Sequence, residues 1–334
     1  MSGLETNSLS PSPLSPNPLG SGPLGGDLSA LGRPKSVAVR RFRERVIVGS
    51  LALAGCFSIL VTTTIIVVLA RETWGFFQFP DVTLAEFFGG FEWNPLLGAE
   101  KHFGFWPLVS GTLLITLIAA SFALPIGLIA AVYLSEYASP KVRATLKPTL
   151  EILAGIPTVV YGFFALTVIT PLLQKLAPET FGSYNAMSAG LATGIMVLPI
   201  VCSLSEDALR AVPRSLRDGA LALGGTKFDV SVKVVVPAAL SGIVAAFLLA
   251  LSRAIGETMI VALAAGNLAR MTVDPRAEVQ TMTAYMVQIF LGDAPATGIE
   301  YRSSFAVATV LFAITLGLTL VGNLVLRAFR EEYD

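Results

Sequence analysis

Residues 238–265 read AALSGIVAAFLLALSRAIGETMIVALAA, an apolar run that contains only two charged residues, Arg253 and Glu257. As an α-helix this run is long enough to cross the roughly 30 Å of hydrocarbon in a bilayer. Five more apolar runs occur along the chain, at about Val46–Ala70, Pro107–Leu134, Leu150–Leu173, Ala186–Leu204 and Phe305–Leu326. The sequence therefore predicts an all-α integral membrane protein with six transmembrane helices.

The composition also points to the lipid bilayer as the solvent of this chain. Of its 334 residues, 54% are hydrophobic and 14% are charged, and the formal net charge is zero. A water-soluble domain of this size would expose too much apolar surface to stay dissolved. The balanced charge gives no reason to expect nucleic acid as a partner.

Lysine and arginine residues gather on alternate connections between the apolar runs. One group lies just before the first run. The others are Lys141, Arg143 and Lys147 after the second run, the cations within 210–233, and Arg327 with Arg330 after the last run. The other connections carry few cations over greater lengths, so the positive-inside rule places the cation-rich connections in the cytoplasm. We therefore expect a multi-pass protein of the plasma (inner) membrane with both termini cytoplasmic.

Three regions follow from this pattern. Residues 1–40 form a Ser/Pro/Gly-rich tail that we expect to be disordered and cytoplasmic. Residues 41–106 hold the first transmembrane helix and an outer segment whose many aromatic side chains suit the level of the lipid headgroups. Residues 107–330 hold the other five helices as one core, which includes a long cytoplasmic connection at 206–237.

The sequence carries no signature of catalysis or of a resident cofactor. It contains no Walker-type phosphate loop, no GxGxxG after a strand and no nucleophile elbow. Cys56 and Cys202 lie inside apolar runs as packing residues, and the single histidine, His102, has no second histidine with which to hold a metal. We expect no cofactor, no metal site and no enzymatic activity.

Arg253 lies near the middle of its apolar run, where a charge costs roughly 2.5–3.5 kcal/mol. Glu257 follows at i+4, so a continuous helix would place both side chains on one face. One interpretation is an ion pair that only holds this helix against its neighbours. The interpretation that we favour is a transport path, in which the Arg253 guanidinium binds a tetrahedral oxyanion and Glu257 pairs with it when the path is empty.

The connection 206–237 contains a predicted helix of about three turns. Pro213 suits its first turn, and Gly224 suits a left-handed stop after Leu223. Leu216, Ala220 and Leu223 fall on one apolar stripe that could be buried against another surface. An amphipathic helix lying on its own membrane surface is the alternative.

The finer pattern of this connection resembles the EAA loop of ABC-importer permeases. Asp218-Gly219-Ala220 is followed by Gly224 and then by Val234 and Val236-Pro237, at the spacing of that motif. In the family, this loop forms a coupling helix that docks into a cytoplasmic ATPase. The resemblance therefore implies that Asp218, Gly219, Ala220, Gly224 and Pro237 contact an ATPase that hydrolyses ATP on a separate chain.

The string Arg253-Ala254-Ile255-Gly256-Glu257-Thr258 resembles a signature of the phosphate-specific transport (Pst) permeases. Gly111-Thr112, Leu153–Pro157 and Val160-Tyr161-Gly162 look more like the C-type than the A-type subunit of that family. The resemblance implies a type I, MetI-like ABC permease that carries inorganic phosphate. Its implied partners are a homologous A-type permease, a cytoplasmic ATPase dimer and an external phosphate-binding protein.

Several alternatives remain open. A path lined by arginine also suits a permease for sulfate, molybdate or another oxyanion, and the chain could be the A-type phosphate subunit. A secondary transporter driven by an ion gradient would need no ATPase contact, so failure of the loop Arg214–Gly225 to bind an ATPase would favour that class.

Overall fold

A computed structural model describes residues 37–95, 101–292, 295 and 298–328 of the chain. The first 36 residues of the expected tail and Arg330 lie outside the described residues. The chain divides into two units, residues 1–63 and 64–334. The described part of the first unit belongs to helix α1 (Val37–Phe76), which includes the last four residues of the segment expected as tail. Side chains 41–63 are all exposed, as in an apolar helix surrounded by lipid.

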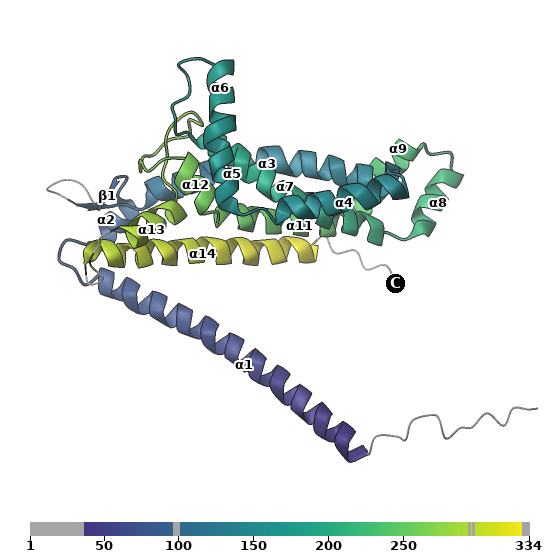
Figure 1. Cartoon of the computed structure of the whole chain (residues 1–334), viewed down its shortest axis with the longest axis horizontal. Coiled ribbons are helices and arrows are strands. Elements are labelled where there is room, and N and C mark those ends of the chain that lie inside the picture. The colour runs from purple at the N-terminus through teal and green to yellow at the C-terminus, as the bar shows by residue number, and fades with distance from the viewer. Residues whose placement is uncertain (1–36, 96–100, 293–294, 296–297, 329–334) are drawn as a thin grey trace, which may run out of the picture. The chain divides into compact units, whose positions relative to one another are not determined.

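The second unit is built around long helices. α3 (Trp106–Val132), α7 (Ala186–Ala211), α11 (Leu240–Ile255) and α14 (Ile299–Ala328) run alongside one another (Figure 1). Among the described residues, five helical segments are long and apolar enough to cross a membrane, and a sixth results if the bent pair Lys227–Ala238 and Leu240–Ile255 is one span. This confirms the all-α class and agrees with the six predicted transmembrane helices.

The most extensive contact between two helices of this unit is that of α3 with α7. Small residues recur at Ala186, Gly190 and Gly194, a spacing that predicts close approach of another helix. A Cβ added at Gly190 would lie 2.6 Å from the Ile118 side chain, and one at Gly194 would lie 3.0 Å from Phe122. The small residues therefore serve packing within the chain, against α3.

The third predicted span begins later than the sequence indicated. Residues 150–154 belong to a separate helix, α4 (Pro140–Ala154), and the span itself consists of α5 (Thr158–Phe164), the π-helical turn η3 (Ala165–Ile169) and α6 (Thr170–Leu176). Pro157 causes the break, because a proline lacks an N–H to donate and disfavours the helical conformation of the residue before it. The Tyr161 hydroxyl donates to the Leu153 carbonyl (2.7 Å) and so ties the two helices together across the break.

The fifth predicted span is also interrupted. It is preceded by a π-helical turn, η4 (Ser231–Val235), and by α10 (Val236–Ala238), and the chain bends by 70° before α11. α11 ends at Ile255, and a short helix, α12 (Met259–Ala264), follows after Gly256. The run that opened the sequence analysis is therefore not one continuous helix, which changes the geometry expected for Arg253 and Glu257.

The outer aromatic segment contributes to a buried cluster shared with later helices. It contains α2 (Leu84–Gly89) and the antiparallel strands β1 (Trp93–Asn94) and β2 (His102–Phe103). Phe76, Phe87 and Trp93 are buried together with side chains of α13 (Met282–Leu291), whereas Trp74, Phe88 and Trp106 are exposed. Edge-to-face ring contacts hold this cluster together. Only part of the aromatic set is therefore free to face lipid headgroups.

Different helices and strands lie at the two ends of the bundle. One end carries α8 (Arg214–Ala222) and α9 (Lys227–Val230), and the other carries α2, α13 and the strands (Figure 1). We call these the α8 end and the strand end. Cys202 is buried in the apolar cluster at the α8 end, as expected of a packing residue, whereas Cys56 is exposed on α1.

Candidate functional site

The connection between α7 and α11 folds into two short helices joined by a tight turn. Pro213 occupies the N-cap position of α8, one residue before the predicted first turn, and Gly224, two residues after the end of α8, has a φ of +86°. Because a side chain disfavours this left-handed conformation, the turn requires glycine, and the predicted stop at Gly224 is confirmed. Thr226 then caps α9 by accepting a hydrogen bond from the Asp229 N–H (3.2 Å). The connection begins at Val212 and not at Glu206, because α7 continues to Ala211.

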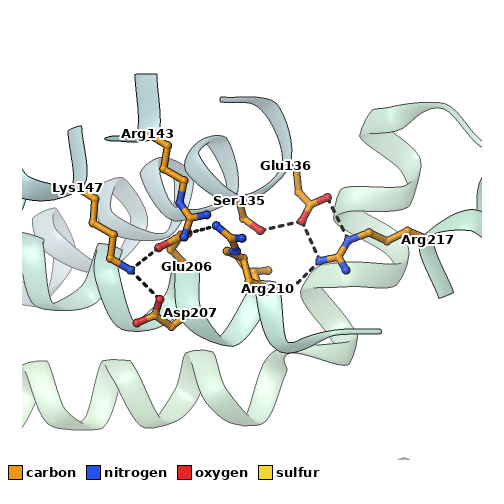
Figure 2. A network of polar contacts seen from close by, with 9 residues as sticks. Ser135, Glu136, Arg143, Lys147, Glu206, Asp207, Arg210 and Arg217 are labelled. Atoms are coloured by element: carbon orange, nitrogen blue, oxygen red, sulfur yellow. Dashed lines mark hydrogen bonds and ion pairs between the residues drawn. The ribbon is translucent and has the colours of Figure 1, made fainter. Parts of the chain in front are cut away.

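Arg217 anchors α8 to the bundle. Its Nη2 lies 3.1 Å from Oε1 of Glu136, and its Nε lies 3.4 Å from Oε2 (Figure 2). The same guanidinium donates to the carbonyls of Leu209 (2.7 Å) and Val212 (2.6 Å) at the end of α7, where helix carbonyls lack the usual i+4 donor. Glu136 belongs to the π-helical turn η2 (Tyr133–Tyr137), so one side chain joins α8, α7 and η2.

The inward face of α8 is therefore not the predicted apolar stripe. Ala220 packs against the apolar cluster at the α8 end, but Leu216 is exposed and Leu223 is 90% exposed. Arg217 points toward the bundle instead, because there its guanidinium forms an ion pair and donates to two carbonyls. This corrects the predicted face and leaves Leu216 and Leu223 free to meet another surface.

The residues matched to the EAA motif lie mostly on the outside of this helix and turn. Asp218, Gly219, Gly224 and Pro237 are exposed, and Ala220 is half-buried. A Cβ added at Gly219 or Gly224 would meet no other atom within 4 Å. Asp218 makes no hydrogen bond or ion pair with any described residue. Four of the five residues are therefore available to a partner.

A buried carboxylate links α4 to α7 beside this helix. Glu206 is 1% exposed and is paired with Arg143 and Lys147 of α4, with Lys147 Nζ 3.0 Å from Oε2. Arg210 Nη1 lies 3.7 Å from Oε1, and Lys147 also contacts Asp207 Oδ1 at 2.8 Å. We call these five residues the Glu206 cluster (Figure 2). The bond to Asp207 raises the pKa of Lys147 above its usual value, so this side chain is charged at neutral pH.

Sequence reasoning did not single out Glu136 or Glu206. Both residues lie where an apolar run meets a basic connection, and this position could have marked them in the sequence as ion-pair partners. A carboxylate there can reach the cations that the positive-inside rule places beside it. α4 has no fully buried side chain, so its ion pairs are central to its attachment to α7.

Arg253 and Glu257 do not form the predicted pair. The helix ends between them, and the Glu257 carboxylate accepts hydrogen bonds from the N–H groups of Met259 (3.1 Å) and Ile260 (3.3 Å) at the start of α12. Glu257 is 3% exposed, and its carbonyl accepts from Thr283 Oγ1 (2.6 Å). Arg253 is exposed on α11 and has no hydrogen bond or ion pair with any described residue. The two residues thus have separate surroundings.

Two glycines, both in segments that resemble the phosphate permeases, allow close packing near the break between α11 and α12. A Cβ added at Gly111 would lie 2.4 Å from the Gln280 carbonyl oxygen, and Thr112 Oγ1 accepts from the Met282 N–H (3.1 Å). A Cβ added at Gly162 would lie 2.8 Å from the Leu263 side chain in α12. Both glycines let the backbone around Glu257 pack close to α3 and α5.

Comparisons with known proteins agree with this geometry. The family described as binding-protein-dependent transport system inner membrane component matches residues 123–331. A phosphate transport system permease protein PstC from Xylella fastidiosa is 30% identical over 83% of this chain and 91% of its own length. A probable ABC transporter permease protein YqgH from Bacillus subtilis is 29% identical over 80% of this chain and 86% of its own length.

Solved structures share the fold. A bacterial ABC transporter that imports alginate aligns with a TM-score of 0.63 at 13% identity, covering 88% of this chain and 99% of that one. An inward-facing MetNI methionine ABC transporter aligns with a TM-score of 0.51 at 18% identity, covering 68% of this chain and 95% of that one. At these identities the likeness concerns the arrangement of the helices, which is that of MetI-like permeases.

Proposed function

Because the chain belongs to the family of binding-protein-dependent transport system inner membrane components, we propose that it is the permease subunit of an ATP-driven importer of inorganic phosphate. The observation that carries the choice of phosphate is the similarity, over more than four fifths of the chain, to a protein named as a phosphate transport system permease. The same similarity favours the C-type subunit.

Arg253 is the residue that we assign to the phosphate path. An arginine in a membrane-spanning region has to face water or protein, because lipid cannot solvate it. Arg253 is exposed on this chain and no described carboxylate neutralises it, so its guanidinium is available to an anion. We assign Glu257 a different part in the path, that of holding the break between α11 and α12 in shape through the two N–H groups that it accepts.

α8 is the element that we assign to coupling with the ATPase. Asp218, Gly219 and Gly224 face outward around its turn, and Pro237 is exposed where the chain enters α10. Ala220 would contribute by seating the helix, since it packs inward. Arg217 joins α8 to η2 and α7, so a push on α8 would reach the transmembrane helices directly.

The remaining parts of the assembly follow from the same proposal. The α8 end, with the cations of α4, α7 and α8, faces the cytoplasm, and both termini lie on that side of the inner membrane. The partners are a homologous A-type permease, an ATPase dimer at the α8 end and an external phosphate-binding protein at the strand end. Transport proceeds by alternating access of the permease pair.

Uptake of labelled phosphate into vesicles tests this function. The vesicles hold this chain with its neighbouring subunits and the binding protein, with ATP inside or absent and with excess unlabelled sulfate as competitor. The proposal requires uptake that depends on ATP and is unaffected by sulfate. Competition by sulfate would make the substrate a broader class of oxyanion, and uptake without ATP would contradict the importer itself.

A further inference from the structure

A cavity of about 530 Å³ lies at the α8 end, between η2, the start of α4, the end of α7, and α8 and α9. Five cationic side chains line it: Arg143, Arg210, Arg214, Arg217 and Lys227. Two acidic side chains, Glu136 and Asp218, line it as well. We call this cavity the cationic pocket, and Arg143, Arg210, Arg217 and Glu136 are seen in Figure 2.

The charges in and behind the cationic pocket do not cancel. Glu136 forms an ion pair with Arg217. The buried Glu206, which does not line the pocket, pairs with Arg143, Lys147 and Arg210. The five lining cations and Lys147 make six positive charges. The carboxylates are those of Glu136, Asp218, Glu206 and Asp207, so two positive charges are in excess. Arg214 and Lys227 are exposed, and a cavity that gathers more positive than negative charge attracts an anion.

Within the described part of the chain, two of the lining cations have no ion-pair partner, and the lining carboxylate of Asp218 has none either, so the excess is shared between these side chains and the Glu206 cluster. Arg214 forms no hydrogen bond or ion pair with a described residue. Lys227 has no acidic partner among the described residues, and its Nζ lies 5.1 Å from the centre of the Tyr137 ring. Arg214 belongs to α8 and Lys227 to α9, so an anion bound by both would also tie the proposed coupling loop to α4 and α7.

An apolar groove continues from this pocket along α4. A second cavity of about 400 Å³ is lined by Pro140, Ala144 and Pro148 and by the charged residues Arg143, Lys147 and Glu151, and it shares Pro140 and Arg143 with the cationic pocket. Val142, Leu146 and Ile152 of the same helix are exposed. A cationic pocket that opens into an apolar groove suits a molecule with an anionic head and an apolar chain.

We propose that the cationic pocket binds a phosphate group, and that its ligand is a phosphate-bearing anion of the cytoplasmic side. A phosphate group has more acceptor oxygens than a carboxylate, so it can accept from the Arg214 fork and from Lys227 at the same time. Two sources share this chemistry: the headgroup of an anionic phospholipid, whose chain would lie in the α4 groove, and free inorganic phosphate. The cytoplasmic placement rests on the proposed function, but binding to the pocket does not.

The test measures binding to the purified full-length chain in two arms. In one arm, native mass spectrometry compares retention of phosphatidylglycerol with that of zwitterionic phosphatidylcholine. In the other arm, thermal unfolding in neutral detergent follows a titration with inorganic phosphate at constant ionic strength. Neither arm depends on uptake, so failure here and failure of the importer assignment are distinguishable.

The pocket variant is Arg214→Gln with Lys227→Gln. Its matched control is Lys141→Gln with Lys233→Gln, which removes the same charge from exposed positions outside the pocket. We expect the pocket variant to bind the responding ligand about tenfold more weakly, because it loses two charge-assisted contacts, and the control to bind as the parent does.

The outcomes separate the sources and the null result. Selective loss of phosphatidylglycerol assigns the site to a lipid headgroup, and selective loss of the phosphate-dependent shift assigns it to the free anion. The proposal is overturned if neither ligand binds, or if both double variants weaken binding equally. Arg214→Gln alone replaces the double variant if that variant unfolds at a lower temperature without ligand.

Discussion

Arg217 of α8 and Glu136 of η2 form a bidentate ion pair, with Nη2 3.1 Å from Oε1. The arginine side chain is 18% exposed and the glutamate side chain 10%. The same guanidinium also bonds the last carbonyls of α7. The position of α8 therefore depends on a contact between residues 81 positions apart in the chain. A helix held mainly by charge, with its leucines outside, is suited to pass on displacement without being part of the core.

Arg217→Gln should loosen α8 without unfolding the bundle. Loss of the guanidinium removes the charged partner of Glu136 and one donor each from the Leu209 and Val212 carbonyls, which costs about 2–3 kcal/mol for groups this well covered. Hydrogen exchange measured by mass spectrometry should rise in 214–222 and stay unchanged in α3. Lys233→Gln, in an exposed ion pair with Asp229, is the control and should change neither region. Equal exchange in parent and Arg217→Gln would show that Ala220 packing alone seats the helix.

Glu206→Gln should weaken the attachment of α4 far more than Asp207→Asn does. Both carboxylates contact Lys147, but Glu206 is 1% exposed and also pairs with Arg143, whereas Asp207 is 56% exposed. Breaking the buried cluster should cost about 3 kcal/mol and breaking the exposed contact less than about 1 kcal/mol. Chemical unfolding in detergent gives both numbers. Similar losses in the two variants would mean that burial of Glu206 adds nothing.

Gly111→Ala should destabilise the chain, although alanine is the better helix former. The added Cβ would lie 2.4 Å from the Gln280 carbonyl, so the 280 segment has to move, at a cost of about 1–3 kcal/mol. Gly317→Ala in α14 is the matched control, because a Cβ there meets nothing within 4 Å and helix propensity should stabilise it by about 1 kcal/mol. Opposite shifts of the unfolding temperature are expected. A stabilised Gly111→Ala variant would contradict the close approach.

Arg253→Gln and Glu257→Gln should differ in their effect on phosphate uptake. Arg253→Gln should abolish ATP-dependent uptake in the assembled complex, because it removes the guanidinium that we assign to the phosphate path. Glu257→Gln should retain most uptake, because the amide oxygen can still accept from the N–H groups of Met259 and Ile260. If the two residues acted as one ion pair, both variants would fail alike, and disassembly of the Arg253→Gln complex in detergent would indicate a structural part for this arginine.

Much of the architecture could be read from local sequence. The length and polarity of the apolar runs predict the spans because both are properties of contiguous residues, as in α3, α7 and α14. Gly224 was predictable for the same reason, since a left-handed turn is decided by the absence of one Cβ. The late start of the third span also had a local signal in Pro157, which outweighs the apolar residues before it.

The candidate site was predictable only in part. The sequence singles out Arg253 as a cation in an apolar run, but it pairs that cation with Glu257 on the assumption of a continuous helix, and the break at Gly256 removes the shared face. The inward face of α8 was wrong for a related reason. A helical wheel counts apolar residues, and it does not include the carboxylate and carbonyls that η2 and α7 present to Arg217.

By itself, the sequence determined the class, the number of spans and the residues that carry charge inside or beside them, because hydrophobic length and the penalty for a charge in lipid act on each segment separately. Only the tertiary structure decided which charges meet. Glu136 with Arg217, and Glu206 with Arg143 and Lys147, join residues far apart in the chain. An ion pair depends on the distance between two groups in space, and that distance is set by the packing of helices that the local sequence does not describe.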